Sequence, residues 1–297
     1  MQQDTISQPL MEAPPHINEF RRIIRVMFTR KLVVVGAVII FLTIVMAIFA
    51  PWLAPYPPDA TNLSESLQSP SSTHWLGTDS VGRDTLSRII YGSRTSLAVG
   101  IVSIVIAASL GMTLGLIAGY FSGAINVIIM RFIDALMAFP MILLALVIAA
   151  ILGGGLWNVM IAIGIGLTTI YARLMCGQVL TVKENDYILA ARAYGASNMR
   201  IMLQHIFPNC LPPLIVLVTM QMGSAILAEA GLSFLGIGIR PPGAAWGEMV
   251  NSGYKFLLDK PVLSFAPGIA IMLVVFAFNM VGDGLRDALD PRLRGTV

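Results

Sequence analysis

The sequence is short of charge. Only 12% of its 297 residues are Asp, Glu, Lys or Arg, whereas 56% are hydrophobic, and the mean hydropathy is +0.80. A soluble domain carries about 25% charged residues, so this deficit argues against a soluble protein. The apolar segments also lack the strict alternation of apolar and polar residues that a transmembrane β-barrel requires. An all-α integral membrane protein is therefore expected.

Histidine, cysteine and lysine are scarce as well. His16, His74 and His205 lie far apart, so no cluster with Cys176 or Cys210 is expected to hold a metal. None of the four lysines follows a glycine, and a P-loop needs a Gly-Lys pair to hold nucleotide phosphates. We therefore expect no catalytic residue and no cofactor in this chain. The formal charge of +3 comes with no nucleic-acid-binding motif, so no nucleic-acid partner is expected.

Long apolar segments fill most of the chain. One helix that crosses a bilayer needs about 20 residues, so the longest segments must each contain a turn. Glycine groups at 119–123 and 153–155 supply these turns. The pattern predicts six transmembrane helices, at 32–54, 96–119, 124–151, 156–178, 209–236 and 262–284.

The segments between these helices define the tails and loops. The first 31 residues are too hydrophilic for the apolar part of a signal peptide, so the first helix is expected to be an uncleaved anchor. The prediction divides the chain into a cytoplasmic tail 1–31, a membrane domain 32–290 with external excursions 56–94 and 236–260 and an inner loop 184–208, and a cytoplasmic tail 291–297.

Basic residues indicate the orientation, because cytoplasmic loops carry an excess of Lys and Arg. Placing both termini in the cytoplasm puts five basic residues before the first helix, five in the inner loops and three at the C-terminal end. These make up 13 of the 19 basic residues. Both termini are therefore predicted to be cytoplasmic.

The two external excursions each contain a predicted short helix. Residues 79–92 have a helical pattern with Arg83, Asp84 and Arg88 on the polar side, which predicts an amphipathic helix at the outer interface. The second excursion includes Trp246 and is expected to fold back over the external mouth.

Glycines recur every fourth residue at Gly111, Gly115, Gly119 and Gly123. Small residues at this spacing let a neighbouring helix approach closely in a membrane. Packing within the chain is favoured over a subunit interface.

The inner loop is predicted to form two short helices. Tyr187, Ala190, Ala191 and Tyr194 share one face of the first, which Gly195 ends. Ser197 or Asn198 caps the second, which is expected to stop before Pro208. Two alanines between two tyrosines form a shallow apolar knob, which favours docking into a partner protein over resting on the membrane surface.

Three of the ionisable residues inside the predicted spans are weighed here as candidates for a functional role. Arg131 and Asp134 are three residues apart on a helix and are expected to neutralise each other, with control of an inner gate as the minor alternative. Glu229 has no basic residue within a helical turn. It is expected either to line a translocation pathway, where it could meet a peptide's amino terminus, or to form a hydrogen bond between helices.

The inner loop resembles that of the permease subunits of ATP-binding-cassette importers. Their pattern is Glu-Ala-Ala, three residues, Gly, nine residues and Ile-x-Leu-Pro, and the chain matches it at Ala190, Ala191, Gly195 and Pro208. It departs at Leu189, where the family has Glu, and at His205 and Phe207. Glu184 or Asp186 could supply the missing acid.

Four further segments look like the second, C-type permease of the dipeptide, oligopeptide and nickel branch. They are HWLGTDSVGRDTLSRIIYGSRTSL from His74, MRFIDALMAFP from Met130, AGLSFLGIGIRPPGAAWGEM from Ala230 and FNMVGDGLRDALDPRLR from Phe278.

The resemblance implies the type I importer permease fold in an inner-membrane complex. Its partners would be a second, B-type permease, two ATPases that bind ATP and Mg, and an extracytoplasmic solute-binding protein. The helix that carries Ala190 and Ala191 would seat in one ATPase. Asp79, Arg83, Asp84 and Trp246 are expected to contact the binding protein.

Two rival functions remain open. Import of nickel or a metal chelate would use the same fold, because the binding protein usually selects the cargo. An ion-coupled secondary carrier would need buried titratable groups for the ion. Glu229 is the lone candidate for such a group, and a carrier of this kind would leave the partner-binding loop unexplained.

Overall fold

The computed structural model describes residues 24, 27–239 and 241–289. All of its regular elements in this part of the chain are helices, and a single isolated bridge joins Thr78 and Asp84. Most of the predicted N-terminal tail and the whole predicted C-terminal tail lie outside the described residues, and His16 and five of the basic residues counted above lie there too.

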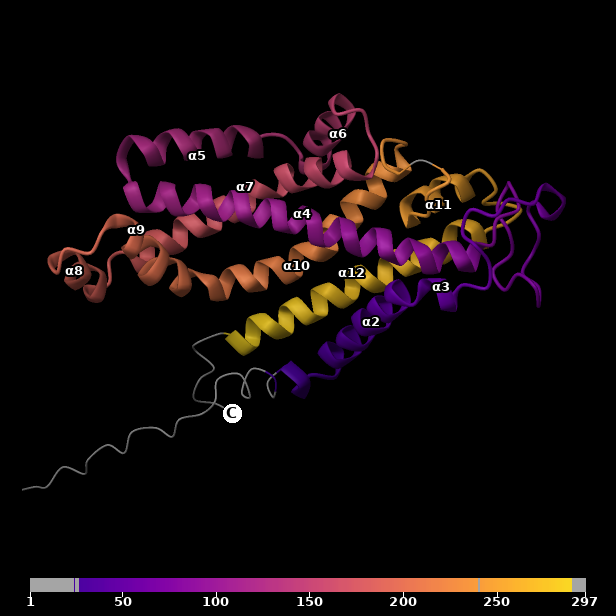
Figure 1. Ribbon diagram of the computed structural model, residues 1–297, viewed down its shortest axis with the longest axis horizontal. Coiled ribbons are helices and arrows are strands. Elements are labelled where there is room, and N and C mark those ends of the chain that lie inside the picture. Colours follow the sequence, from indigo (N-terminus) through magenta and orange to yellow (C-terminus); the bar gives the residue numbers. More distant parts are fainter. Residues whose placement is uncertain (1–23, 25–26, 240, 290–297) are drawn as a thin grey trace, which may run out of the picture.

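Long helices run side by side along the molecule (Figure 1). They are α2 (Lys31–Ile48), α4 (Thr85–Phe121), α7 (Leu156–Val182), α10 (Phe207–Phe234) and α12 (Val262–Leu289). All five are long and apolar enough to cross a bilayer. The bent pair α5 (Gly123–Met137) and α6 (Met141–Ile151) completes the six predicted spans if the two helices are counted as one.

Short helices lie at the two ends of this bundle (Figure 1). One end, here called the α8 end, carries α8 (Asp186–Ala193), α9 (Asn198–Arg200) and the π-helix η2 (Ile201–Ile206). The opposite α11 end carries α11 (Trp246–Tyr254) and the loop after α3 (Ala50–Leu53), which includes the short 3-10 helix η1 (Leu63–Glu65).

The expected single helix at 124–151 is two helices in the structure. The chain bends by 92° between α5 and α6. Pro140 is the residue before α6, and proline has no N–H for a helical hydrogen bond and disfavours helical geometry at Phe139. The bend therefore follows from one proline within residues 135–151, which carry no charge.

The predicted amphipathic helix at 79–92 does not form separately. Asp84 caps the helix α4, which starts at Thr85 and continues for 37 residues to Phe121. At 1.5 Å per residue this helix is about 55 Å long, well beyond the ~30 Å hydrocarbon core of a bilayer. The residues expected to face water, Arg83, Asp84 and Arg88, are buried.

The glycine stripe packs α4 against α7, as the packing interpretation predicted. A Cβ atom on Gly111 would lie 2.5 Å from the Thr168 carbonyl oxygen, and one on Gly115 would lie 2.4 Å from that of Ala172. Gly119 faces Val179 in the same way, whereas Gly123 has no such neighbour. Backbones of α4 and α7 thus approach more closely than any larger residue allows.

Two apolar cores hold the bundle together. The larger joins α4, α7 and α10 around residues such as Tyr171, Met175 and Leu214. The smaller surrounds Trp246 and joins α2, α4, α11 and α12. Helix α2, by contrast, exposes Leu32, Phe41 and Leu42. An apolar outer surface of this kind suits contact with lipid.

Candidate functional sites at the two ends of the bundle

Local sequence defines α8 as a short, sharply ended helix. Asn185 precedes it in an extended conformation, and Asp186 places an acid in its positively polarised first turn. Gly195 then adopts a φ of +78°, which glycine reaches without steric cost. The Ala196 N–H donates to the Ala191 carbonyl oxygen at 3.0 Å and closes the helix end.

One fully buried apolar side chain anchors α8 in the core of the bundle. Ile188 is fully buried and belongs to the larger core, and Ala191 packs against the same core while partly exposed. Tyr187 and Ala190 are exposed, and Tyr194 is 93% exposed. Three residues of the predicted docking face are therefore available to a partner, whereas Ala191 turns partly inward.

The sequence interpretation missed Ile188. It is the one β-branched apolar residue in α8, and it lies three residues before Ala191, the spacing of one helical face. Leu189, at the position where the resembling family has Glu, is exposed. Glu184 and Asp186 are exposed nearby, so their carboxylates are accessible at this end.

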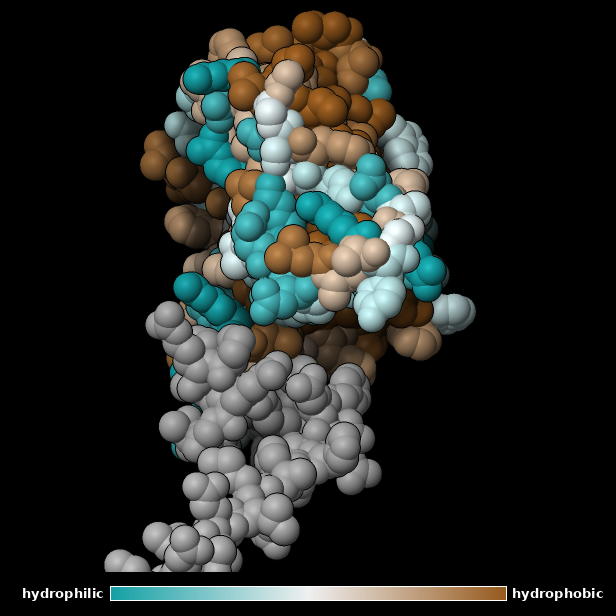
Figure 2. Space-filling model, turned by 90° about the vertical axis from the view of Figure 1, so that its left-hand side faces the viewer, coloured by the Kyte–Doolittle hydropathy of each residue, from teal (hydrophilic) through white to brown (hydrophobic). Residues whose placement is uncertain are grey.

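Polar residues dominate the surface around α8. Figure 2 views this end of the molecule: hydrophilic residues gather in the middle of the face, and hydrophobic residues lie mainly above them and at the upper left edge. This end therefore combines a water-exposed centre with margins suited to lipid.

The predicted stop before Pro208 is wrong. Ser197 caps α9, and the chain then continues through the π-helix η2 directly into α10, in which Pro208 occupies the first turn. Proline supplies no N–H to the continuous helix, and a local π-helical adjustment accommodates such a loss. The wider π-helical turns precede it, and the Asn209 side chain donates to the His205 carbonyl oxygen at 2.6 Å.

Residues at the end of α4 join this loop to the bundle. The Tyr120 hydroxyl donates to Asn198 Oδ1 at 2.7 Å, and the Arg192 guanidinium lies over the Tyr120 ring, 5.5 Å from its centre. Lys183, just after α7, donates to Ser122 Oγ at 2.7 Å. No motif pointed to Tyr120, because it ends a predominantly apolar helix.

The expected pairing of Arg131 with Asp134 is also wrong. Asp134 forms an ion pair with Arg173 of α7 instead. Arg131 is exposed and makes no ion pair with any residue that the structure describes. Close packing of α5 beside α7 brings Arg173 to the acid, a contact between helices that spacing along one helix could not reveal.

Glu229 is 1% exposed within α10. Ser233, one turn further along the same helix, donates its hydroxyl to Glu229 Oε1 at 2.6 Å. The other oxygen, Oε2, has no hydrogen-bond partner among the described residues. The carboxyl thus lies inside the chain, and its bond is within one helix rather than between two helices as one alternative had it. This burial favours packing over an open pathway.

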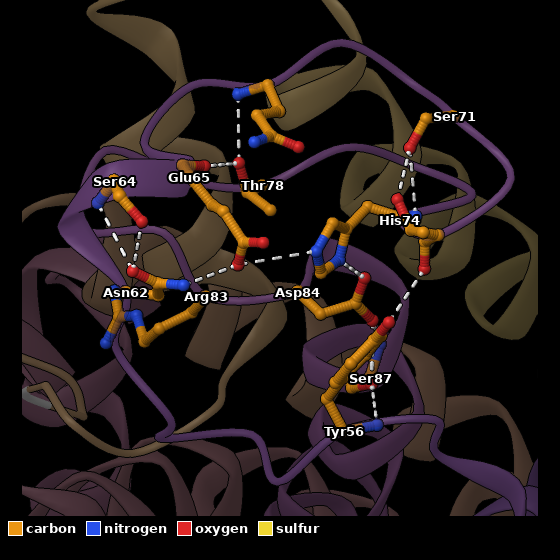
Figure 3. Close-up of polar contacts among 12 residues, drawn as sticks. Tyr56, Asn62, Ser64, Glu65, Ser71, His74, Thr78, Arg83, Asp84 and Ser87 are labelled. Carbon is orange, nitrogen blue, oxygen red and sulfur yellow. Dashed lines mark hydrogen bonds and ion pairs between the residues drawn. The ribbon is translucent and has the colours of Figure 1, made fainter.

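A buried hydrogen-bonded cluster caps α4 at the α11 end (Figure 3). Asp84 Oδ2 accepts from the backbone N–H and the hydroxyl of Ser87, each at 2.7 Å. Asp84 Oδ1 contacts His74 Nδ1 at 2.9 Å, and His74 Nε2 lies 3.8 Å from Glu65 Oε2. An aspartate in this position is a favoured helix cap, and here it also fixes the preceding loop.

Arg88 ties the two external excursions together. It is 1% exposed and forms an ion pair with Glu248 of α11 at 3.0 Å. Its guanidinium also donates to the carbonyl oxygens of Pro58, Pro242 and Gly243, each at 3.2 Å. Arginine suits this position because its planar fork carries five donors.

Trp246 adds the second excursion to the buried network of Asp84, Arg88 and Glu248, and these four residues with the loops they join are called the cap below. It is fully buried, and its indole N–H donates to the Ile89 carbonyl oxygen at 2.9 Å. A Cβ atom on Gly92 would lie 2.6 Å from the indole ring, so this glycine makes room for it. Trp246 therefore packs the second excursion onto the first, and the expected position of this excursion over an external mouth stays a prediction.

The residues expected to contact a binding protein are therefore mostly inside the cap. Arg83, Asp84 and Trp246 are buried, and Asp79 accepts from the Arg83 side chain at 2.6 Å with only 14% of its own side chain exposed. They hold the cap's shape and do not form its outer surface. Docking surfaces and buried networks in loops both contain charged and aromatic residues. The sequence therefore could not tell which of the two these residues form.

Comparison with known proteins shows which family shares these features. A model of the family described as binding-protein-dependent transport system inner membrane component matches residues 111–295. A model of the N-terminal TM domain of oligopeptide transport permease C matches residues 19–70. Together the two matches cover most of the chain.

Individual relatives agree with this match. The chain is 44% identical over 298 residues to the dipeptide transport system permease protein DppC of Alkalihalophilus pseudofirmus, covering 97% of this chain and 98% of that protein. It is 45% identical over 271 residues to the glutathione transport system permease protein GsiD of Pectobacterium atrosepticum, covering 90% and 89%.

Solved structures show a similar fold. An inward-facing structure of the MetNI methionine ABC transporter aligns with a TM-score of 0.56 over 69% of this chain and 97% of that chain, at 18% identity. A structure of an amino acid ABC transporter with histidines aligns with a TM-score of 0.51 over 70% and 95%. At this level of identity the likeness concerns the fold alone.

Proposed function

The chain belongs to the family of binding-protein-dependent transport inner membrane components, in its dipeptide and oligopeptide branch, and we propose that it forms half of the translocation pathway of an ATP-driven importer of di- and oligopeptides. Members of this family are multi-pass permeases of the inner membrane and not ATPases. The printed functions of the relatives, which include dipeptide and glutathione transport, support a peptide cargo.

The proposed complex contains a second permease, two ATPases that bind ATP and Mg, and an extracytoplasmic binding protein. In this complex the α8 end faces the cytoplasm and the α11 end faces the binding protein. The excess of basic residues in the inner loops and at the termini supports this orientation.

The observation that carries the mechanism is the exposed face of α8. A helix fixed by buried Ile188 while Tyr187, Ala190 and Tyr194 remain exposed suits insertion into a groove on another protein. We propose that this groove lies on one ATPase and that α8 is the coupling helix. Small alanine side chains between the tyrosines let the partner approach the helix backbone.

The transport cycle follows from this contact. ATP binding closes the ATPase pair, α8 moves with its ATPase, and the helix bundle opens outward to receive peptide from the binding protein. ATP hydrolysis restores the inward-facing state. Reversing a 1:99 equilibrium between two such states requires about 5.5 kcal/mol of differential binding, which ATP bound between two ATPases can supply.

Nickel or metal-chelate import is the alternative within the same family. The binding protein would select that cargo, so uptake assays with labelled dipeptide, oligopeptide and nickel distinguish the two. An ion-coupled carrier is disfavoured, because the family that the chain matches depends on a binding protein.

The coupling role is tested by enlarging Ala190. In the complete transporter, Ala190→Trp is expected to prevent α8 from entering the ATPase groove, because the added indole has no room there. Co-purification of the ATPases with the permease should fall at least tenfold, which corresponds to about 1.4 kcal/mol of binding free energy. ATP-dependent peptide uptake should fall with it.

Ala60→Trp provides the control, because Ala60 is an exposed alanine in the loop at the opposite end. It should leave co-purification of the ATPases unchanged. Wild-type ATPase binding and uptake by Ala190→Trp would contradict the coupling role of α8.

A further inference from the structure

Tyr120 occupies the position at which the loop that carries α8 meets the bundle. It is the second-last residue of α4 and is 7% exposed. Its hydroxyl donates to Asn198 beyond the end of α8, and its ring faces Arg192 within α8. A single side chain of α4 therefore contacts the loop on both sides of the turn at Gly195.

A residue that precedes α8 in the sequence also contacts the end of α4. Lys183, three residues before α8, donates to Ser122 Oγ at 2.7 Å and to the Gly119 carbonyl oxygen at 3.2 Å. Contacts before, within and beyond α8 thus converge on the last turn of one helix. Displacement of α8 relative to α4 would break several of them together.

The other end of α4 is fixed just as firmly. Asp84 caps it, and Arg88 in its first turn binds backbone and side chain of both external excursions. Between these ends α4 is an uninterrupted helix, and its glycine stripe packs it tightly on α7. Displacement of the last turn of α4 would therefore be transmitted to the cap, because no break in the helix separates the two.

We propose that Tyr120 is a positioning residue that transmits the displacement of α8 to α4. The proposal rests on the coupling function of α8 proposed above, and it adds the residue through which the motion enters the membrane domain. Asn198 fixes the orientation of the hydroxyl, and Arg192 fixes the ring. Tyr120 itself is buried and so is not part of the surface that the ATPase would contact.

Tyr120→Phe tests the proposal, because it removes the bond to Asn198 and keeps the ring. The variant is placed in the complete complex of both permeases, both ATPases and the binding protein, reconstituted in liposomes. ATP hydrolysis and uptake of labelled peptide are measured in the same preparation. We expect normal co-purification of the ATPases and a fall of roughly fivefold in peptide transported per ATP, the factor set by one typical hydrogen bond.

Asn198→Ala removes the same bond from its other side. It should lower the transport ratio to a similar extent, and the double variant should show little further loss. Two independent losses that multiply would mean that the two residues do not act through their shared bond, and this would overturn the proposal.

Tyr171→Phe is the matched control. Tyr171 is a fully buried tyrosine of α7 whose hydroxyl has no hydrogen-bond partner among the described residues. Its variant should keep the wild-type ratio of peptide to ATP. An equal fall in both Phe variants would assign the effect to general packing and overturn the role of Tyr120.

The outcomes distinguish failure of this inference from failure of the proposed function on which it rests. A wild-type ratio in Tyr120→Phe, with ATPase binding still lost in Ala190→Trp, would overturn the role of Tyr120 and leave the coupling role of α8 intact. If the wild-type chain bound no ATPase, the proposed function itself would fail.

Discussion

The two ends of α4 carry similar residue types but are built differently. At the α11 end, Asp84 and Arg88 are buried, and each is bonded to more than one group of the same chain. At the α8 end, Tyr187 and Tyr194 are exposed, and only Ile188 anchors the helix fully. The buried polar groups of the first end are bonded within the chain, whereas the second end leaves Tyr187 and Tyr194 exposed.

Burial changes what a charged residue does at each end. A buried charge must keep its partners, because losing one leaves the other charge desolvated and unpaired. This requirement gives the α11 cap one fixed geometry. Exposed side chains carry no such penalty, so Tyr187, Ala190 and Tyr194 can contact a partner at little cost to the fold.

Arg88→Ala gives the strongest test of this comparison through its effect on the free energy of unfolding. It leaves Glu248 buried without its cation and removes the donors to three carbonyl oxygens. We expect the free energy of unfolding to fall by about 3–5 kcal/mol, the range for a buried pair that loses one member. Titration of the purified chain from mild detergent into dodecyl sulfate measures the change.

Arg200→Ala is the control at the α8 end. Arg200 is exposed and bonds to Gln204 one helical turn away, so its loss should change the unfolding free energy by under about 0.5 kcal/mol. Similar unfolding curves for the two variants would show that the buried network does not stabilise the cap as described.

The sequence predicted the long apolar helices and the short helix α8 well because both are local patterns. Unbroken apolar segments identify spans, and Ala190, Ala191 and Gly195 lie close enough together to form a motif. The bend at Pro140 was missed because apolarity continues through it, although the proline itself was the available signal.

Contacts between distant segments were beyond the reach of such patterns. Tyr120 bonds to Asn198, 78 residues away along the chain, and Arg88 bonds to Glu248, 160 residues away. Hydrophobic period and charge indicate which residues belong to a helix or loop, but not which helices are neighbours. The same limit explains why Asp134 was assigned to Arg131 instead of Arg173.

Gly115→Ala would disturb the helix that joins the two ends. Its new Cβ would lie 2.4 Å from the Ala172 carbonyl oxygen and 2.7 Å from Met175 Cβ. Overpacking of this kind costs about 1–3 kcal/mol, and we expect a loss of unfolding free energy in that range in the same titration.

Gly177→Ala is the matched control on α7, where a Cβ would meet nothing within 4 Å. It should leave stability unchanged or raise it by up to about 1 kcal/mol, because alanine favours a helix over glycine. If both variants were equally stable, α4 and α7 would not be held at the spacing seen here.

Tyr194→Ala and Trp246→Ala sharpen the comparison with one aromatic residue from each end. Trp246 is fully buried and its loss should cost about 3–5 kcal/mol. Tyr194 is 93% exposed, so its loss should change the unfolding free energy of the isolated chain by under about 0.5 kcal/mol, the smallest effect expected here. The same dodecyl sulfate titration compares the two variants directly.

The Tyr194 variant should nevertheless retain less ATPase in the assembled transporter, measured by co-purification, because the exposed ring belongs to the proposed docking face. A stability loss as large as that of Trp246→Ala would contradict the comparison, since it would mean that the α8 end, too, is completed within the chain. Full stability combined with weaker ATPase retention would instead show that the exposed aromatic residues serve the partner and the buried ones serve the fold.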